Sequence, residues 1–81
     1  MPLLVPGRYR HYKGNLYQVL GLGTHSESLE KLVVYKALYG DGAVWIRPAS
    51  MFFETVEHEG YEMPRFALEE ETAALLDAPL P

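Results

Sequence analysis

The sequence of 81 residues contains no cysteine. It therefore has no disulfide bridge to hold a small fold together and no thiolate to bind a metal. A domain of this size buries only roughly 60% of the surface that its unfolded chain exposes. The hydrophobic core must supply the stability by itself, or the chain must associate with a second copy. A homodimer is therefore compatible with this composition.

Long hydrophobic runs are also missing. No apolar stretch approaches the ~20 residues that a membrane-spanning helix needs. The opening residues 1–7 have neither a basic region nor an apolar run of the length found in signal peptides. At 48% hydrophobic residues the chain is nevertheless too apolar to be disordered. We expect one folded domain in the cytoplasm, with no membrane contact.

A basic surplus is the third absence. Lys and Arg number 7 against 11 Asp and Glu, which gives a net charge of −4. Proteins that bind nucleic acid through its phosphates usually carry excess positive charge, so this balance weighs against a nucleic-acid partner. Residues 1–18 still hold Arg8, Arg10 and Lys13 and no acid. A local basic face that binds a small molecule or nucleic acid therefore stays open as an alternative function.

The most informative stretch is residues 32–48. Two runs rich in β-branched and aromatic residues flank Gly40-Asp41-Gly42, where the glycines can take positive φ without steric cost. This pattern predicts a β-hairpin at the centre of the fold. We expect one face of the hairpin to build the core and the other to remain available for recognition. The expected core face carries Val34, Leu38, Val44 and Ile46, and the available face carries Tyr35, Tyr39, Trp45 and Arg47, with Trp45 opposite Tyr39 or Ala37.

Short alternating runs on both sides of the hairpin predict further strands. The expected strands are residues 8–12, 16–22, a brief extension at 54–57, and 65–68, with a bend or bulge at Gly21 and Gly23. Residues 24–31 are read as a polar loop, and residues 49–53 as one helical or 3₁₀ turn that covers one end of the sheet with Met51 and one Phe. Residues 69–77 are read as a short helix or, equally, a frayed tail. The fold class is mainly β, a small SH3-like antiparallel barrel, with an extended arm at 1–6, a single barrel domain at 7–68 and a tail at 69–81.

Four segments resemble a known family in the same order along the chain. They are Gly7–Val19, Val34–Tyr39, Trp45–Phe52 and Pro64–Phe66. Together they resemble the small bacterial proteins classified only as domain of unknown function 1653, over about residues 7–68. The resemblance implies a compact SH3-like β-barrel of bacterial origin. It implies no reaction, ligand or catalytic residue.

Aromatic residues and one arginine form the main candidate binding surface. Tyr hydroxyls, Trp and a guanidinium can hold an extended peptide, and Arg47 can bind a carboxylate or phosphate through two parallel hydrogen bonds. The bland alternative is that the aromatic rings simply fill the core, with their hydroxyl groups at its rim. The candidate residues are Tyr9, Tyr12, Tyr35, Tyr39, Trp45 and Arg47.

Histidines are the other candidates for chemistry. His25 with Glu27 and Glu30 could form a metal set or an acid–base pair, although the spacing matches no standard motif and a solvated loop explains the same residues. His11 lies among cations that would lower its pKa, as a general base requires, but a histidine hydrogen-bonded across the sheet explains it equally.

The sequence thus favours a non-enzymatic binding module whose partner is an extended peptide or another protein. A small-molecule or nucleic-acid binder using Arg8, Arg10 and Lys13 is the alternative. An enzyme or metal site around His11 or His25 and Glu27 is the third candidate. No cofactor is expected, and no residue is assigned a catalytic role.

Overall fold

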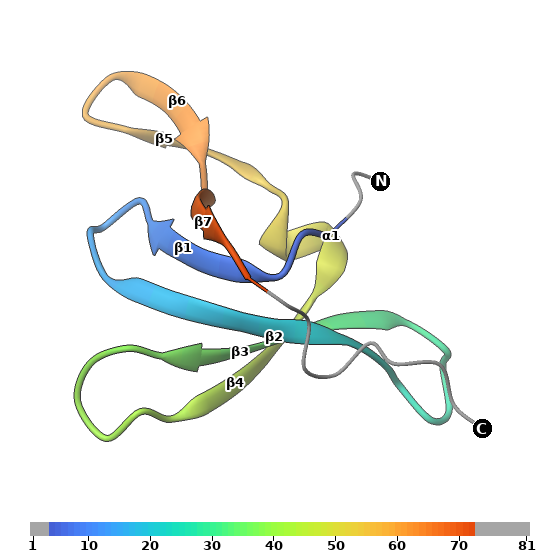
Figure 1. Cartoon of the computed structure of the whole chain (residues 1–81). Coiled ribbons are helices and arrows are strands. Elements are labelled where there is room, and N and C mark those ends of the chain that lie inside the picture. The colour runs from blue at the N-terminus through green and yellow to red at the C-terminus, as the bar shows by residue number, and fades with distance from the viewer. Residues whose placement is uncertain (1–3, 73–81) are drawn as a thin grey trace.

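The computed structural model describes residues 4–72. Seven strands and one helical turn follow each other along the chain (Figure 1). They are β1 (Gly7–His11), β2 (Leu16–Thr24), β3 (Lys31–Ala37), β4 (Val44–Pro48), α1 (Ala49–Phe52), β5 (Thr55–His58), β6 (Tyr61–Pro64) and β7 (Phe66–Glu71). The protein is therefore mainly β, as the sequence predicts, and the hairpin over residues 32–48 is confirmed as β3 and β4.

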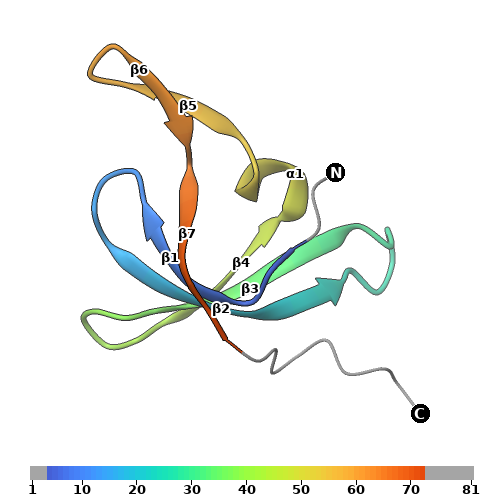
Figure 2. The same ribbon diagram turned by 45° about the horizontal axis from the view of Figure 1, so that its top comes forward.

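Five strands form one antiparallel sheet in the order β4-β3-β2-β1-β7, and β5 and β6 form a separate hairpin that projects from it (Figure 2). The sheet is curled but open, because its end strands β4 and β7 do not pair with each other. Within the described residues the sheets are antiparallel but not closed into a barrel, so the SH3-like barrel expected from the sequence is not confirmed. Side chains, and not a hydrogen-bonded ladder, join the two ends: Phe52 of α1 stacks on Phe66 of β7 with ring centroids 4.3 Å apart.

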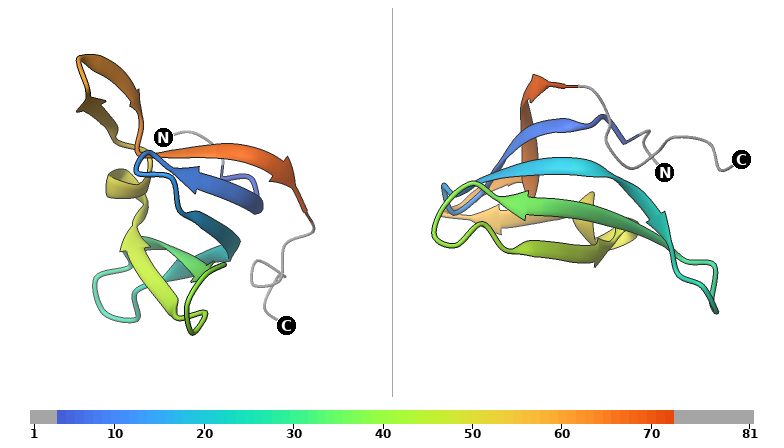
Figure 3. Two further views of the ribbon diagram at one scale, coloured as in Figure 1. Left: turned by 90° about the vertical axis from the view of Figure 1, so that its left-hand side faces the viewer. Right: turned by 60° about the horizontal axis from the view of Figure 1, so that its bottom comes forward.

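The curl of the sheet depends on β2, which pairs with both β1 and β3 (Figure 3). Its register with β3 shifts between Val19 and Gly21, which is a β-bulge at the place where the sequence predicts a bend. A bulge increases the local twist and bends the strand. The concave side of the bent sheet holds the core, which comprises Tyr9, Val19, Val33, Tyr35, Ala49, Phe52 and Phe66.

The face of the central hairpin that builds the core is the opposite of the one predicted. Val33, Tyr35 and Ala37 of β3 are buried, whereas Val44 and Ile46 of β4 are exposed on the convex side. Both faces of β3 are apolar, so alternation alone could not select between them. The aromatic face of β3 forms the core because Tyr35 contacts Phe52 and Phe66, whose large rings fill the concave side.

The helical turn after Pro48 is confirmed as α1. Ala49 and Phe52, three residues apart on one side of the turn, are buried in the core. Met51, which was expected to cover the end of the sheet, lies on the other side of the turn and is exposed. Residues 4–72 contain no helix that is long and apolar enough to cross a membrane.

The last described strand corrects the expectation of a helix or frayed tail from residue 69. Glu69 to Glu71 belong to β7, where Glu70 pairs with Arg8 and Glu71 with Gly7. Pairing along β1 gives these residues backbone hydrogen bonds that a helix of under three turns could hardly match in stability. The remainder of the predicted helix, residues 73–77, lies outside the described residues.

Candidate functional site

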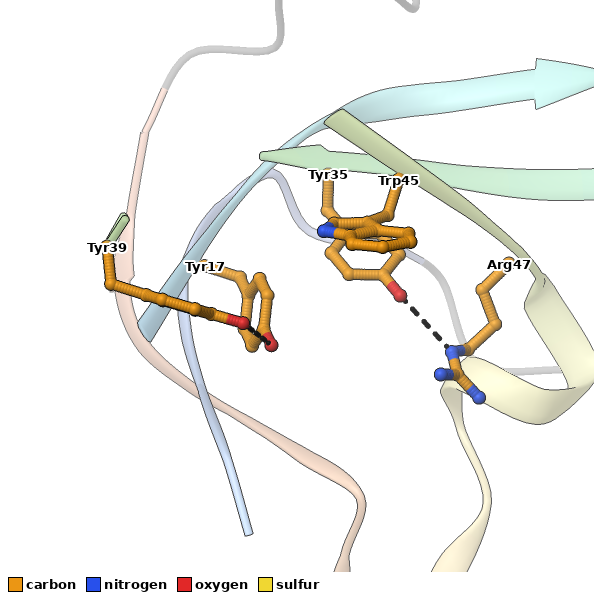
Figure 4. A pocket seen from close by; sticks show the side chains of 5 residues that line it. All are labelled: Tyr17, Tyr35, Tyr39, Trp45 and Arg47. Atoms are coloured by element: carbon orange, nitrogen blue, oxygen red, sulfur yellow. Dashed lines mark hydrogen bonds between the residues drawn. The ribbon is translucent and has the colours of Figure 1, made fainter. Parts of the chain in front are cut away.

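A pocket opens on the concave side of the sheet beside the end strand β4. It has a volume of ≈ 200 Å³. Its lining residues come from β2, β3, the following loop and β4, and they are Tyr17, Tyr35, Tyr39, Trp45 and Arg47 (Figure 4). The structure thus brings together the four hairpin residues that the sequence singled out and adds Tyr17.

The strand register explains why these side chains meet. Tyr35 of β3 lies directly between Val19 of β2 and Trp45 of β4, so all three point to the same face. The expectation that Trp45 would lie opposite Tyr39 or Ala37 is therefore wrong. Arg47 is two residues beyond Trp45 on β4 and shares its face, because side chains alternate along a strand.

The five side chains differ in exposure, and this difference defines the shape of the pocket. Tyr35 is only 5% exposed and forms the floor, whereas Trp45 at 52% and Tyr39 at 45% stand at the rim. In Figure 4, Tyr17 and Tyr39 lie on one side and Arg47 on the other, with Tyr35 and Trp45 between them. The alternative that the aromatic rings simply fill the core therefore holds for Tyr35 and not for Trp45.

Hydrogen bonds fix the side chains on both sides of the floor. The hydroxyl oxygens of Tyr17 and Tyr39 are 2.6 Å apart and share one hydrogen bond. Arg47 donates from Nε to the Tyr35 hydroxyl at 3.3 Å, and its guanidinium carbon lies 6.0 Å from the centre of the Phe66 ring. The guanidinium is thus oriented by one hydrogen bond and one cation–π contact.

Arg47 differs from every other arginine of the chain in its charge partners. Arg8 and Arg10 form ion pairs with Glu69, and Arg65 with Glu54. Arg47 forms no ion pair with any carboxylate in the stretch from residue 4 to residue 72. Its terminal nitrogens therefore offer donors for an outside carboxylate or phosphate.

The tyrosine pair has an electrostatic consequence. Burial raises the pKa of Tyr17 to about 12, and the hydrogen bond with Tyr39 adds to the shift. The Tyr17 hydroxyl consequently stays protonated through the neutral range and remains a hydrogen-bond donor or acceptor. Together, the pocket presents two tyrosine hydroxyls, an indole and a guanidinium around an aromatic floor.

The remaining predicted binding residues lie elsewhere. Tyr9 is a core residue at 5% exposure, and its hydroxyl donates to the Val5 carbonyl. Tyr12 packs beside His11 and against His58 of the projecting hairpin, with ring centroids 4.5 and 5.3 Å away. Neither lines the pocket, so they do not extend the surface as the sequence suggested.

His11 packs behind the pocket. Its ring is 5.0 Å from Phe66 and 6.3 Å from Tyr17 between centroids. Burial lowers its pKa, and the positive charges of Arg65, Lys13 and Arg47 lower it further. The expected direction is confirmed, but the hydrogen bond is not across the sheet: Nδ1 accepts from the Lys13 backbone amide at 3.1 Å.

His25 has a structural task in its loop. Its Nδ1 accepts hydrogen bonds from the backbone amides of Glu27 and Ser28 at 3.1 and 3.2 Å. A nitrogen that accepts from two amides closes a turn and is not available to a metal. No group of three potential His, Cys, Asp or Glu ligands forms within residues 4–72, so His25, Glu27 and Glu30 are not brought together as a metal set.

The basic face predicted near the N-terminus is neutralised. Arg10 Nε lies 2.6 Å from a Glu69 carboxylate oxygen, and Arg8 Nη2 lies 3.3 Å from a Glu70 carboxylate oxygen. The register shift of β1 against β7 leaves Glu69 unpaired in the ladder, and the side chain of Glu69 reaches both arginines. This pairing counts against Arg8 and Arg10 as a phosphate-binding surface.

Tyr17 is the pocket residue that sequence reasoning missed. It was placed with Val19 on one face of its strand, and that face is buried at Val19. Its directly opposite residue on β3 is Ala37, which has a small side chain. An aromatic residue opposite an alanine in the neighbouring strand was the available signal, but it required the register to be known.

Comparison with known proteins identifies the family to which the chain belongs. The chain matches the model of the protein family of unknown function DUF1653 over residues 7–68. It is also similar to the crystal structure of a DUF1653 protein from Bordetella bronchiseptica, with 38% identity and a TM-score of 0.79, over 86% of this chain and 92% of that one. No curated protein matches. The chain therefore belongs to the DUF1653 family, which confirms the resemblance noted in the sequence.

Proposed function

We propose that this protein is a non-enzymatic binding module, and that its partner is an extended peptide or protein segment that carries a carboxylate. The segment lies on the pocket formed by Tyr17, Tyr35, Tyr39, Trp45 and Arg47. Aromatic rings contact its apolar parts, and Arg47 binds its carboxylate. The observation that carries the proposal is the charge of Arg47, which has no carboxylate partner within residues 4–72 although it is oriented toward the pocket.

The chemistry of the pocket supports a carboxylate ligand. Arginine presents planar donors that match a carboxylate through two parallel hydrogen bonds. Tyr35 occupies Nε of Arg47, which leaves the terminal nitrogens for the ligand. Hydrogen bonds to a charged group contribute about 1.5–3 kcal/mol each.

The exposure of the rim supports an extended ligand that crosses the surface, in contrast to a small molecule enclosed by it. Trp45 and Tyr39 are each about half exposed at the rim. Trp and Tyr are frequent anchors of protein and peptide interfaces, because they bury a large area with few rotatable bonds. A volume of ≈ 200 Å³ holds one or two side chains and not a whole drug-sized ligand.

A random linear peptide library displayed on phage tests the proposal. We expect the enriched peptides to share an Asp, a Glu or a terminal carboxylate, and we expect Arg47→Gln to weaken their binding by about tenfold or more, since the charge-assisted hydrogen bonds of the guanidinium are lost. Trp45→Ala is expected to keep the fold but lose capture, because Trp45 is 52% exposed. Circular dichroism and calorimetric titration measure the two effects.

Lys31→Gln is the matched control. It removes one positive charge from the same hairpin, where Lys31 bonds only to the Thr24 hydroxyl, away from the pocket. If Lys31→Gln and Arg47→Gln weaken peptide binding equally, the loss comes from the change in net charge and not from a contact with Arg47. Enriched peptides without a carboxylate, or full binding by Arg47→Gln, would reject the proposal.

A further inference from the structure

The outer edge of β4 is an unpaired strand edge. β4 is the end strand of the sheet, with β3 on one side only. Among residues 4–72, no other helix or strand lies along its outer side (Figures 1 and 3). An edge strand presents a row of free backbone donors and acceptors, which a further strand can pair with.

The register of β3 and β4 identifies which residues present those groups. The Ala37 amide donates to the Ala43 carbonyl at 2.9 Å. Hydrogen-bonded pairs recur every second residue in an antiparallel ladder, so Trp45 and Arg47 also direct their backbone groups toward β3. The backbone N–H and C=O groups of Val44 and Ile46 consequently point outward, and no backbone bond to either is found outside the strand ladder of residues 4–72.

The side chains at this edge are apolar. Val44 is 57% and Ile46 64% exposed on the convex face, and neighbouring Leu38 is also exposed. Natural edge strands are usually protected by charged residues, and the only charged residue of β4, Arg47, points to the concave pocket. An open, uncharged edge of β-branched residues favours pairing with another strand.

From these observations we propose that β4 pairs with β4 of a second copy of this chain, which joins two sheets into one across a twofold axis. The second copy is the occupant because the edge is complementary to itself. In an antiparallel pairing centred on Trp45, Val44 of each chain faces Ile46 of the other. Each such pair exchanges two backbone hydrogen bonds, so all four outward-pointing residues of the two chains are satisfied.

No other antiparallel register of two β4 strands satisfies all of these outward-pointing backbone groups. Centring on Ile46 would place Val44 opposite Pro48, which has no N–H to donate. Centring on Val44 would place Ile46 opposite Gly42, which has φ 69° and already donates its N–H to the Tyr39 carbonyl. Trp45 is thereby fixed on the twofold axis.

The dimer also changes the pocket. A twofold axis perpendicular to the joined sheet keeps both concave faces on one side, so Trp45 of the second copy lies beside Trp45 of the first. Directly opposite residues of a non-hydrogen-bonded pair have Cβ atoms only about 4.5–5.5 Å apart, and aromatic pairs stabilise such positions. The two pockets become one continuous aromatic surface, to which each copy contributes its Trp45.

The absence of cysteine from the chain permits a direct test of the register. Opposite residues of a non-hydrogen-bonded pair have Cα atoms about 4.5 Å apart, which lies within the range of about 4.4–6.8 Å for disulfides. Trp45→Cys is expected to form a disulfide-linked dimer under mild oxidation. Val44→Cys is the control: Val44 is about as exposed as Trp45, but the two Val44 residues of the dimer do not face each other.

Sedimentation of the full-length chain tests the dimer itself. We expect the wild type to reach twice the mass of one chain as its concentration rises, and both Ile46→Pro and Ile46→Lys to remain at the mass of one chain. Ile46→Pro removes an outward N–H without removing a bond to β3, and Ile46→Lys places like charges across the axis if the proline variant fails to fold. Leu68→Lys, the same kind of change at a 45% exposed residue of β7 at the other end of the sheet, should leave the dimer intact.

Each contrary outcome rejects the proposal. A wild-type chain that stays monomeric at every concentration rejects the dimer. A dimer that survives both Ile46 variants uses another surface. A dimer in which Trp45→Cys crosslinks no faster than Val44→Cys does not have this register. These readouts are independent of peptide binding, so the proposed function can fail or hold separately.

Discussion

The two ends of the sheet are protected in different ways. β7 carries Glu69, Glu70 and Glu71, and two of these carboxylates pair with Arg8 and Arg10 of β1. β4 at the other end carries Val44, Trp45 and Ile46, all exposed, and its one arginine points into the pocket without an acidic partner. One edge is therefore charged, with two of its carboxylates paired to arginines, whereas the other is apolar and carries one arginine that has no acidic partner within residues 4–72.

The difference separates stability from recognition. At the β7 end, Glu69 and Glu70 pair with Arg10 and Arg8, and Phe66 anchors the strand in the core. A row of carboxylates would also repel a second β7 strand. At the β4 end, within residues 4–72, the outward backbone groups of Val44 and Ile46 have no partner and Arg47 has no acidic partner, so this end is where we place both proposed contacts.

The largest expected difference between the two ends is in how much one aromatic residue of each end contributes to the free energy of unfolding. Phe66→Ala should lower the free energy of unfolding by about 3–5 kcal/mol, because it leaves a cavity beside the stacked ring of Phe52. Trp45→Ala should cost only a small part of that, since Trp45 is 52% exposed. Urea denaturation at low protein concentration measures both, and equal losses would contradict the comparison.

A smaller effect is expected where β1 and β7 approach closely. A Cβ atom added at Gly7 would lie 2.2 Å from the Glu70 carbonyl oxygen, so the backbone of β7 would have to move. Gly7→Ala should therefore cost about 1–3 kcal/mol, as overpacking usually does.

Gly23→Ala on β2 is the control for Gly7→Ala. The nearest atom to an added Cβ at Gly23 is a Val34 methyl carbon at 3.6 Å, which is ordinary contact. Thermal denaturation of both variants should separate them. A similar loss in the two would mean that the close approach at Gly7 relaxes without cost.

The charged pairs of β7 should contribute less still. Glu69→Gln removes the partner of Arg10, but both side chains are partly exposed, and such pairs contribute about 0.2–1 kcal/mol. The loss should shrink as salt is added, because salt screens exposed charges. An effect that does not depend on salt would show that Glu69 acts through the bulge and not through its charge.

The smallest effect concerns the tyrosine pair beside β4. The pKa of Tyr17 is raised from 10.0 to about 12, so this group favours the folded state below pH 10.0, and its contribution is lost as the pH rises toward about 12. Tyr39→Phe removes the hydrogen bond and should lower the pKa of Tyr17 without restoring the ordinary value, since burial is the largest cause.

Ultraviolet titration of tyrosinate absorbance measures this change. The wild type should show a tyrosine that ionises at about pH 12 and stability that declines above pH 10.0. A tyrosine titration that is identical in the wild type and in Tyr39→Phe would show that the hydrogen bond between Tyr17 and Tyr39 does not affect the pKa of Tyr17.

Much of the local structure could be predicted from the sequence. Gly40-Asp41-Gly42 specifies its turn through glycines that take positive φ, at 57° and 69°. Pro48 ends β4, and the helical turn follows it as expected. These features depend on residues adjacent in the chain, so local pattern was sufficient.

The site was predicted only in part. Tyr35, Tyr39, Trp45 and Arg47 were grouped correctly because they alternate on one hairpin. Tyr17 was missed because its place depends on the pairing of β2 with β3. Tyr9 lies in the core and does not line the pocket, and nothing local in the sequence reveals that its ring packs against Phe52 with centroids 5.4 Å apart.

The sequence by itself determined most of the strands, the turn at residues 40–42, the family and four of the five residues from which the pocket is built. Only the tertiary structure decided which face of the hairpin is the core, because both faces are apolar and the choice depends on Phe52 and Phe66 packing against Tyr35. The tertiary structure also decided which arginines form ion pairs. Arg8 and Arg10 meet Glu69 some sixty positions later in the chain, whereas Arg47 meets no acid within residues 4–72, and such pairings arise only when distant strands are brought together.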